Sequence, residues 1–209
     1  MEKVTELLER YPRLRPCGAA IEAAIGALRD MYERGGKVLL CGNGGSAADC
    51  EHIVGELAKG FLLPRPMTED MQEKLRELFP RDAESFARLM QRGIPAISLP
   101  SQTAVQSAYG NDVDAEYFYA QLVQVYGKDG DVLLCLSTSG NSANVCRAAQ
   151  MAKAMGLCVI ALTGAGPCKL DPLSDVVIHV PERDTFKIQE LHLPVYHAVC
   201  AQLEQDFFA

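Results

Sequence analysis

Several features that mark particular protein classes are missing from this sequence. No apolar run approaches the length of a transmembrane helix, so we expect no membrane span. Basic residues are comparatively few, because 20 Lys and Arg face 27 Asp and Glu, and the formal net charge is −7. This balance argues against a nucleic-acid-binding surface and leaves room only for a local basic patch. We therefore expect neither a membrane nor a nucleic acid as a partner.

Paired cysteines are also missing. The eight cysteines lie singly, without a C-x-x-C pair, and several of them, such as Cys41, Cys135 and Cys158, lie inside apolar segments. Such cysteines are typical of reduced, buried small residues in a cytosolic protein. Residues 1–12 carry charges throughout and lack the apolar core of a signal peptide. The expected location is therefore cytoplasmic.

A glycine-rich turn, residues 42–45, follows an apolar segment. Residues 37–41 form a short apolar run, which is typical of a buried parallel strand. Three glycines then interrupt the pattern, and residues 46–57 have the character of a helix. A strand, a glycine-rich turn and a helix start present backbone N–H groups and a positive dipole end to an anion. The glycine spacing matches neither the dinucleotide motif G-x-G-x-x-G nor a P-loop.

Two polar side chains follow on the predicted helix. His52 and Glu56 are four residues apart, so they share one helix face beyond the glycine-rich turn. On spacing alone, a pair of surface residues and a functional pair both fit.

A second strand end carries a cluster of hydroxyl groups. Residues 131–136 form another apolar run, and a helix-like segment extends to about Met155. The loop between them, residues 137–142, is called the serine loop here, and its hydroxyl side chains are Ser137, Thr138, Ser139 and Ser142. Hydroxyl donors, free N–H groups and a helix dipole hold a phosphate dianion without a lysine. The alternative is a serine-rich loop that only caps the helix.

The order of the predicted elements indicates one α/β domain. Further strands fit residues 95–99, 158–162 and 176–180, and helical segments separate the five strands. This alternation predicts a doubly wound five-stranded parallel sheet with helices on both faces. Ligands in such sheets bind at the carboxyl ends of strands, where the glycine-rich turn and the serine loop lie. The length fits a single domain, residues 1–209.

Helices are predicted at both ends of the chain and in an insertion. Two N-terminal helices are expected within residues 1–35, over 2–10 and 18–34. Further helices are expected over 101–108, where residues 109–112 end the helix, and over 185–207. Residues 62–93 predict a helical insertion with short helices over 69–79 and 82–92. Its simpler interpretation is a surface insertion. A lid or pocket wall is the alternative, because the insertion follows closely after Glu56.

These motifs together resemble one known family. The chain is similar to the sugar isomerase (SIS) domain family, and more narrowly to the phosphoheptose isomerases, in GNGGSAAD, in His52 and Glu56, in LSTSGNSANV, and in residues 110–112 and 188–197. The resemblance covers most of the chain apart from roughly residues 62–92. It implies a single SIS domain that assembles as a homotetramer.

The resemblance implies an aldose–ketose isomerase that acts on a sugar phosphate through an enediol. Sedoheptulose 7-phosphate is the expected substrate, and D-glycero-D-manno-heptose 7-phosphate is the expected product. Moving a proton between adjacent carbons needs a base at the carbon and an acid for the oxygens. By resemblance, Glu56 is this base and His197 is this acid.

The resemblance also assigns the binding groups. The serine loop would anchor the phosphate, while Asn43, Ser46 and the pair Asn111 and Asp112 would contact sugar hydroxyls. The full set of expected substrate-binding residues is Asn43, Gly44, Gly45, Ser46, Asn111, Asp112, Ser137, Thr138, Ser139, Ser142 and Gln189.

A zinc site is a further implication of the resemblance. Some family members bind zinc, and the matching residues here are His52, Glu56, Gln189 and His197. Two imidazoles, a carboxylate and an amide oxygen are suitable zinc ligands. Glu56 cannot easily be both a tight ligand and a free base, so its two roles compete. Pro194 lies between Gln189 and His197 and tends to kink a helix, which leaves their relative placement open.

A non-catalytic SIS protein, a sugar-phosphate sensor or an adaptor, is the alternative from another class. Such a protein needs the serine loop but no acid/base pair, so the presence of Glu56 and His197 favours an enzyme. Two positions depart from many phosphoheptose isomerases. Gln102 lies near a position where Asp is common, and Gly60 near one where a basic residue is common, with Lys59 the nearest. Both differences concern sugar recognition more than the reaction.

Overall fold

A five-stranded parallel sheet forms the centre of the protein, as predicted. The computed structural model describes all 209 residues. The strands are β1 Val38–Gly42, β2 Ala96–Ser98, β3 Val132–Leu136, β4 Cys158–Thr163 and β5 Val176–His179. Their order across the sheet is β2-β1-β3-β4-β5, and each neighbouring pair is parallel. The chain turns outward from β1 to β2 and then crosses back to β3, so β1 and β3 enclose the topological switch point.

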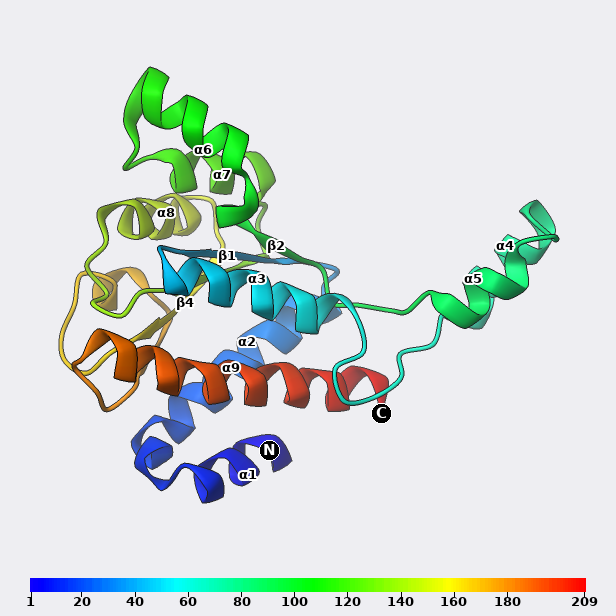
Figure 1. The fold of residues 1–209 in the computed structure, drawn as a ribbon, viewed down its shortest axis with the longest axis horizontal. Coiled ribbons are helices and arrows are strands. Elements are labelled where there is room, and N and C mark those ends of the chain that lie inside the picture. Colours follow the sequence, from blue (N-terminus) through cyan, green and yellow to red (C-terminus); the bar gives the residue numbers. More distant parts are fainter.

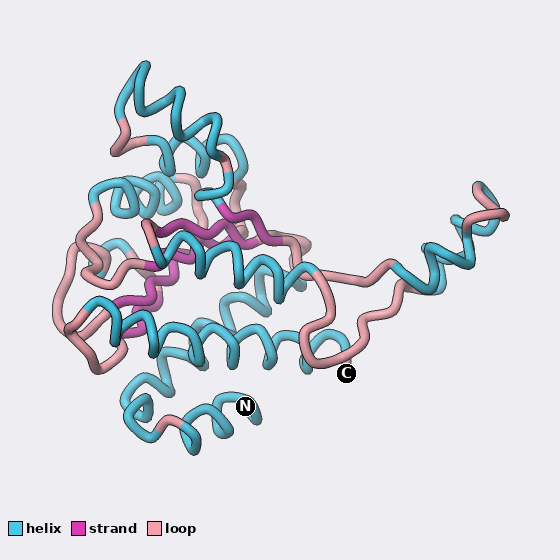
Figure 2. The backbone as a smooth tube through the Cα atoms, in the orientation of Figure 1, coloured by secondary structure: helices cyan, strands magenta, loops and turns pink.

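Helices cover both faces of this sheet (Figures 1 and 2). The larger core packs one face against α1 Glu2–Arg10, α2 Gly18–Glu33, α3 Gly45–Ala58 and α9 Thr185–Phe208. The smaller core packs the other face against α7 Phe118–Tyr126 and α8 Ala143–Ala154. Because both faces are covered, every residue of β1 and β3 is buried, and both strands are accordingly apolar throughout.

One helix differs from its predicted end, and another answers the question of Pro194. Helix α6 (Thr103–Tyr109) was expected to close at residues 109–112, but the chain instead continues into a π-helical turn over Gly110–Asp114. The turn keeps a helical backbone at Gly110, which therefore does not act as a stop. Helix α9 is continuous across Pro194, which is buried within it. The proline therefore does not divide the helix that carries Gln189 and His197.

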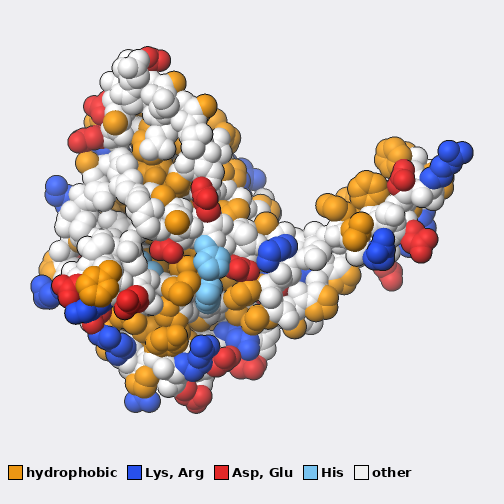
Figure 3. Space-filling view, in the orientation of Figure 1, with side chains coloured by type: hydrophobic (Ala, Val, Ile, Leu, Met, Phe, Trp, Pro, Cys, Tyr) orange, Lys and Arg blue, Asp and Glu red, His pale blue; other side chains and the backbone are white.

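The predicted insertion forms an arm that projects from the body (Figure 1). It contains α4 Glu69–Leu78 and α5 Ala83–Leu89, the second of which is shorter than expected. An antiparallel bridge between Pro66 and Gln91 closes its base. Ala83 is the only buried residue of the arm between these two positions. In the space-filling view the arm points away from the exposed histidines, as a surface insertion does (Figure 3).

No helix in the structure combines the length and the apolar character that crossing a membrane requires.

Candidate active site

The glycine-rich turn joins β1 to α3 at the switch point. Gly44 has a positive φ of 57°, a conformation that favours glycine, and α3 begins at the next residue. A Cβ atom on Gly45 would lie 2.4 Å from Nε2 of Gln189, so glycine here lets the amide of α9 approach the first turn of α3. Asn43 is exposed at this turn and Ser46 is buried beneath it.

The serine loop lies beside this turn, since Gly42 of β1 and Leu136 of β3 are direct neighbours in the sheet. Ser137 is buried, accepts a hydrogen bond from the N–H of Gly140 at 3.2 Å, and lies 3.4 Å from the Ser142 hydroxyl. Ser139 is exposed and accepts from the N–H of Asn141 at 3.1 Å. Helix α8 begins directly after Ser142. The predicted hydroxyls therefore surround a helix N-terminus, which favours an anion.

Asn144 connects the two loops, and the sequence analysis did not identify it. Its amide exchanges two hydrogen bonds of 2.9 Å with the amide of Asn43, one in each direction. Its position in the first turn of α8, two residues after Ser142, was the available signal. The glycine-rich turn and the serine loop are thus parts of one polar surface at the strand ends.

A histidine cluster forms where α3 and α9 pack together. Nε2 of His52 lies 3.2 Å from Oε1 of Glu56 and 3.3 Å from Nε2 of His197. The phenolic oxygen of Tyr196 lies 3.1 Å from Nδ1 of His52 and donates to Oδ1 of Asp49 at 3.1 Å. The structure therefore brings together three of the predicted side chains from segments about 140 residues apart. Figure 3 shows exposed histidine atoms on this face.

Burial differs among the members of this cluster. The side chain of His52 is 42% exposed, whereas that of Glu56 is 15% exposed. Oε2 of Glu56 is buried without a hydrogen-bond partner, and Nζ of Lys59 lies 3.6 Å away from it. No donor occupies the lone pairs of this oxygen, but a ligand reaches it only after a neighbouring side chain moves.

Burial, followed by the charge of neighbouring His52, lowers the pKa of His197 below the ordinary imidazole value. Glu56 and Asp49 oppose this shift. Burial raises the pKa of Asp49, while the Tyr196 hydroxyl and the two imidazoles act against it. His197 is therefore neutral near pH 7, which lets its ring both accept and donate a proton.

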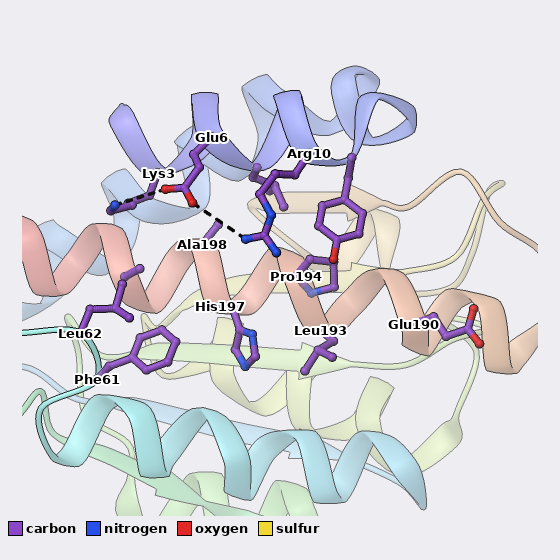
Figure 4. A pocket seen from close by; sticks show the side chains of 13 residues that line it. Lys3, Glu6, Arg10, Phe61, Leu62, Glu190, Leu193, Pro194, His197 and Ala198 are labelled. Carbon is purple, nitrogen blue, oxygen red and sulfur yellow. Dashed lines mark hydrogen bonds and ion pairs between the residues drawn. The ribbon is translucent and has the colours of Figure 1, made fainter.

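A groove of about 270 Å³ lies between α1 and α9 and reaches His197 (Figure 4). Phe61 and Leu193 flank His197 in this groove, and an ion pair between Glu6 and Arg10 lies on its α1 side. Of the cluster, His197 lines this groove, whereas His52 and Glu56 do not.

The donor groups fit zinc in part. In a tetrahedral zinc site with metal–nitrogen bonds of about 2.0–2.1 Å, neighbouring ligand atoms lie about 3.3 Å apart. Nε2 of His52 lies 3.2 Å from Oε1 of Glu56 and 3.3 Å from Nε2 of His197. As they stand, however, no three His, Cys, Asp or Glu side chains are arranged to hold a metal ion. Gln189 is eight residues before His197 on the same helix, a rise of about 12 Å, and its amide lies against Gly45. The structure does not join Gln189 to the other three predicted ligands.

Two predicted substrate-binding residues make no side-chain hydrogen bond to the other predicted site residues. Asn111 and Asp112 are exposed on the π-helical turn after α6, and their one side-chain hydrogen bond, of 2.8 Å, joins them to each other. Helix α6 lies with α7 and α8, across the sheet from α9 (Figure 1). The other two histidines of the chain lie outside the cluster. His179 contacts the Thr163 hydroxyl through Nδ1 at 2.8 Å, and His192 is fully buried.

Asp49 and Tyr196 were also missed by the sequence analysis. Asp49 is three residues before His52 on α3, and Tyr196 directly precedes His197 on α9. The helical spacing of Asp49 was a usable signal, because residues three apart share a face. Nothing local indicated Tyr196, since its role depends on how α9 packs against α3.

Comparisons with known proteins agree with this fold and identify its family. A family model described as "SIS domain" matches residues 1–77 and 74–164. The phosphoheptose isomerase of Rhodospirillum rubrum is 38% identical over 93% of this chain and 89% of its own length. That of Aneurinibacillus thermoaerophilus is 36% identical over 86% of this chain and 77% of its own. Among solved structures, the phosphoheptose isomerase of Neisseria gonorrhoeae superposes with a TM-score of 0.75 at 29% identity, covering 96% of this chain and 94% of that one.

Proposed function

The chain belongs to the phosphoheptose isomerases of the SIS domain family, and we propose that it interconverts sedoheptulose 7-phosphate and D-glycero-D-manno-heptose 7-phosphate. The observation that carries this proposal is the cluster of Glu56 and His197 around His52, with separations of 3.2 and 3.3 Å. A carboxylate and a neutral imidazole, both beside His52, supply the two proton carriers that an enediol mechanism requires.

The proposed reaction moves two protons. Glu56 takes a proton from carbon 1 of the ketose, and the electrons of that bond form the enediol double bond. His197 carries a proton from the oxygen on carbon 1 to the oxygen on carbon 2. Glu56 then returns its proton to carbon 2, which leaves the aldose and restores both side chains. Atoms and charges balance, and no outside reactant is needed.

We propose that the phosphate end of the substrate binds at the serine loop. Support comes from the hydroxyls of Ser137 and Ser142, which lie together beside the first turn of α8. Asn43 and Asn144 join this loop to the glycine-rich turn, where sugar hydroxyls would lie. Holding one end of the chain sets which carbon reaches Glu56.

We further propose a zinc site in which His52, Glu56 and His197 provide the donors, with Gln189 as a fourth ligand after its side chain moves from Gly45. The edge lengths of the cluster support this. A zinc ion held there would act as a Lewis acid on the substrate carbonyl. Because its ligands would include Glu56 and His197, metal binding and proton transfer compete for the same atoms. Metal analysis of the purified protein, by mass spectrometry, tests this site directly.

A cytoplasmic homotetramer completes the proposal, and the resemblance of the chain supports it. Static light scattering coupled to gel filtration measures the assembly. A mass of one or two chains would reject the tetramer.

The central experiment compares the wild-type protein with Glu56→Gln. The amide keeps the shape of the side chain and removes the base. We expect turnover of sedoheptulose 7-phosphate to fall about 10²–10⁴-fold. Exchange of the carbon-bound proton with deuterium from solvent, followed by NMR, should stop with it, while ligand binding persists. Wild-type exchange in Glu56→Gln would rule out Glu56 as the base.

A screen of C5 to C7 ketose phosphates identifies the substrate. We expect aldose formation from the seven-carbon ketose. If the wild-type protein binds sugar phosphates and isomerises none, the non-catalytic sensor takes the place of the proposed enzyme.

A further inference from the structure

An ion pair is buried below the histidine cluster. Arg65 follows α3 and Glu204 lies near the end of α9, and both side chains are fully buried, with Nε of Arg65 donating to Oε1 of Glu204 at 2.8 Å. Taking two charges out of water usually offsets the gain from their attraction, so such a pair contributes little net stability. Its presence calls for a role other than holding the fold together.

Arg65 binds the end of α3 at the proposed base. Nη2 of Arg65 donates to the backbone oxygen of Glu56 at 2.9 Å, and Nη1 donates to that of Leu57 at 2.7 Å. The last carbonyl groups of a helix have no partner within the helix, and a cation there also favours the helix dipole. One guanidinium therefore fixes the backbone from which the Glu56 side chain projects.

Glu204 organises the chain that leaves α3. Its carboxylate accepts from the N–H groups of Phe61, Leu62 and Leu63 at 2.7, 2.6 and 3.0 Å. Burial alone would raise the pKa of Glu204, but these N–H groups and Arg65 outweigh it and lower the pKa. The carboxylate is therefore ionised, and every interaction of Arg65 and Glu204 described here is charge-assisted.

Glu204 also lies seven residues after His197, two turns along the same helix. The chain of bonds thus runs from the backbone of Glu56 through Arg65 to Glu204 and along α9 to His197. We infer that Arg65 and Glu204 are positioning residues, which set the separation of Glu56 and His197 across the packing of α3 against α9. This inference rests on the proposed roles of those two side chains.

The same ion pair lies at the root of the arm, so a purely structural role is the competing explanation. The guanidinium groups of Arg65 and Arg92 lie 4.7 and 4.9 Å from the ring centre of Phe208. Arg92 donates to the backbone oxygen of Pro66 at 3.1 Å and has no recorded bond to α3. Arg92→Met is therefore a matched control, because it loosens the root of the arm and leaves the bonds to Glu56 intact.

The test uses the full-length protein with Arg65→Met and Glu204→Leu combined. Removing both charges together leaves no unpaired buried ion, but it also leaves the backbone groups that the pair binds without these partners. The double variant should therefore fold with a lowered melting temperature. A displacement of about 1 Å at a reacting group costs up to about 100-fold in rate. We expect kcat to fall 10- to 100-fold with a small change in KM, while Arg92→Met keeps the wild-type kcat.

Combining the double variant with Glu56→Gln supplies a readout that a structural role would not move. If the ion pair acts through Glu56, its loss should slow the Glu56→Gln protein far less than it slows the wild type. Equal slowing in both backgrounds overturns the inference, as does a folded double variant with the wild-type kcat. Wild-type turnover in Glu56→Gln alone would instead reject the proposed function.

Arg65→Lys decides the question if the double variant does not fold. A lysine keeps the positive charge but cannot hold Glu204 and two carbonyl groups with a planar fork. We expect its kcat to fall about tenfold while inorganic phosphate still binds with the wild-type affinity. An unchanged kcat, or a parallel loss of phosphate binding, overturns the positioning role.

Discussion

The two ends of the candidate site are built in different ways. The serine loop is a continuous segment, and the hydroxyls of Ser137 and Ser139 accept local hydrogen bonds from Gly140 and Asn141. Further bonds join the loop to residues 162–170. The histidine cluster is assembled from α3 and α9, and no local bond holds Glu56 near His197. The hydroxyls of the serine loop therefore lie together because they are close in the chain, whereas the cluster depends on how two helices pack.

This difference predicts which substitutions change ligand binding and which change the reaction rate. Changes in the serine loop should alter binding of one chemical group, the phosphate. Changes around the cluster should alter the rate, even when they lie far from the substrate in sequence. The predictions below test this separation.

The largest effect is expected at the cluster. His197→Ala should lower turnover about 10²–10⁴-fold, because it removes the proton carrier between the two oxygens. Binding of a phosphorylated, non-reacting sugar alcohol, measured by calorimetry, should stay within a few-fold of the wild type. Thr185→Ser, an exposed change at the start of the same helix and outside the groove, is the control. Loss of binding in His197→Ala would show that the two ends are not separate.

The serine loop should give the opposite pattern. Ser139→Ala with Ser142→Ala should weaken phosphorylated ligands by about tenfold or more for each lost bond to the anion. Free sugars should bind almost as before, and kcat at saturation should change less than KM. Ser85→Ala, an exposed change on α5 of the arm, is the control. Equal weakening of both classes of ligand would reject the phosphate assignment.

The burial of His192 should make the stability of the fold depend on pH, through a residue that belongs to neither the serine loop nor the histidine cluster. Burial lowers its pKa to about 4, and the nearby backbone of Thr163 opposes this without a hydrogen bond of normal geometry. The folded state keeps the ring neutral, whereas the unfolded chain takes up a proton below about pH 6.5. The stability due to the neutral ring is therefore complete above pH 6.5 and is lost as the pH falls towards 4.

The size of this loss follows from the shift in pKa. Between pH 7 and pH 4 the wild type should lose about 3 kcal/mol more unfolding free energy than His192→Leu. Urea unfolding at several pH values measures the difference. Parallel pH profiles for the two proteins would contradict the burial of a neutral imidazole.

The smallest effect is expected from removing the arm. Joining Pro66 to Gln91 through a short Gly-Ser link should keep turnover within about twofold, because these two residues already form a bridge. Kinetics and light scattering of the shortened protein, beside the intact one, provide the test. A large fall in turnover with an unchanged mass would instead make the arm part of the site.

Sequence patterns predicted the sheet and both loops for a physical reason. Strands buried on both faces, such as residues 38–42 and 132–136, must be apolar throughout, and the turns after them must break that pattern. The hydroxyls of the serine loop lie close in space because they are close in the chain. These features need no knowledge of how distant segments meet.

The remaining parts depend on contacts between distant segments. Asn144, Tyr196 and Arg65 are ordinary residues in their local sequence, and their roles arise from partners at Asn43, Asp49 and Glu204. The distance between Gln189 and its predicted co-ligands also follows from the continuous course of α9. Helical spacing alone could not decide whether Pro194 would bring them together.

The bridge at the root of the arm has an evolutionary consequence. Because the two chain ends of the arm meet at Pro66 and Gln91, a new segment can enter or leave at this point as a single genetic event. The body on either side keeps its course whatever the inserted length. Homologous chains can therefore differ in length at this junction while the residues of the candidate active site are inherited unchanged.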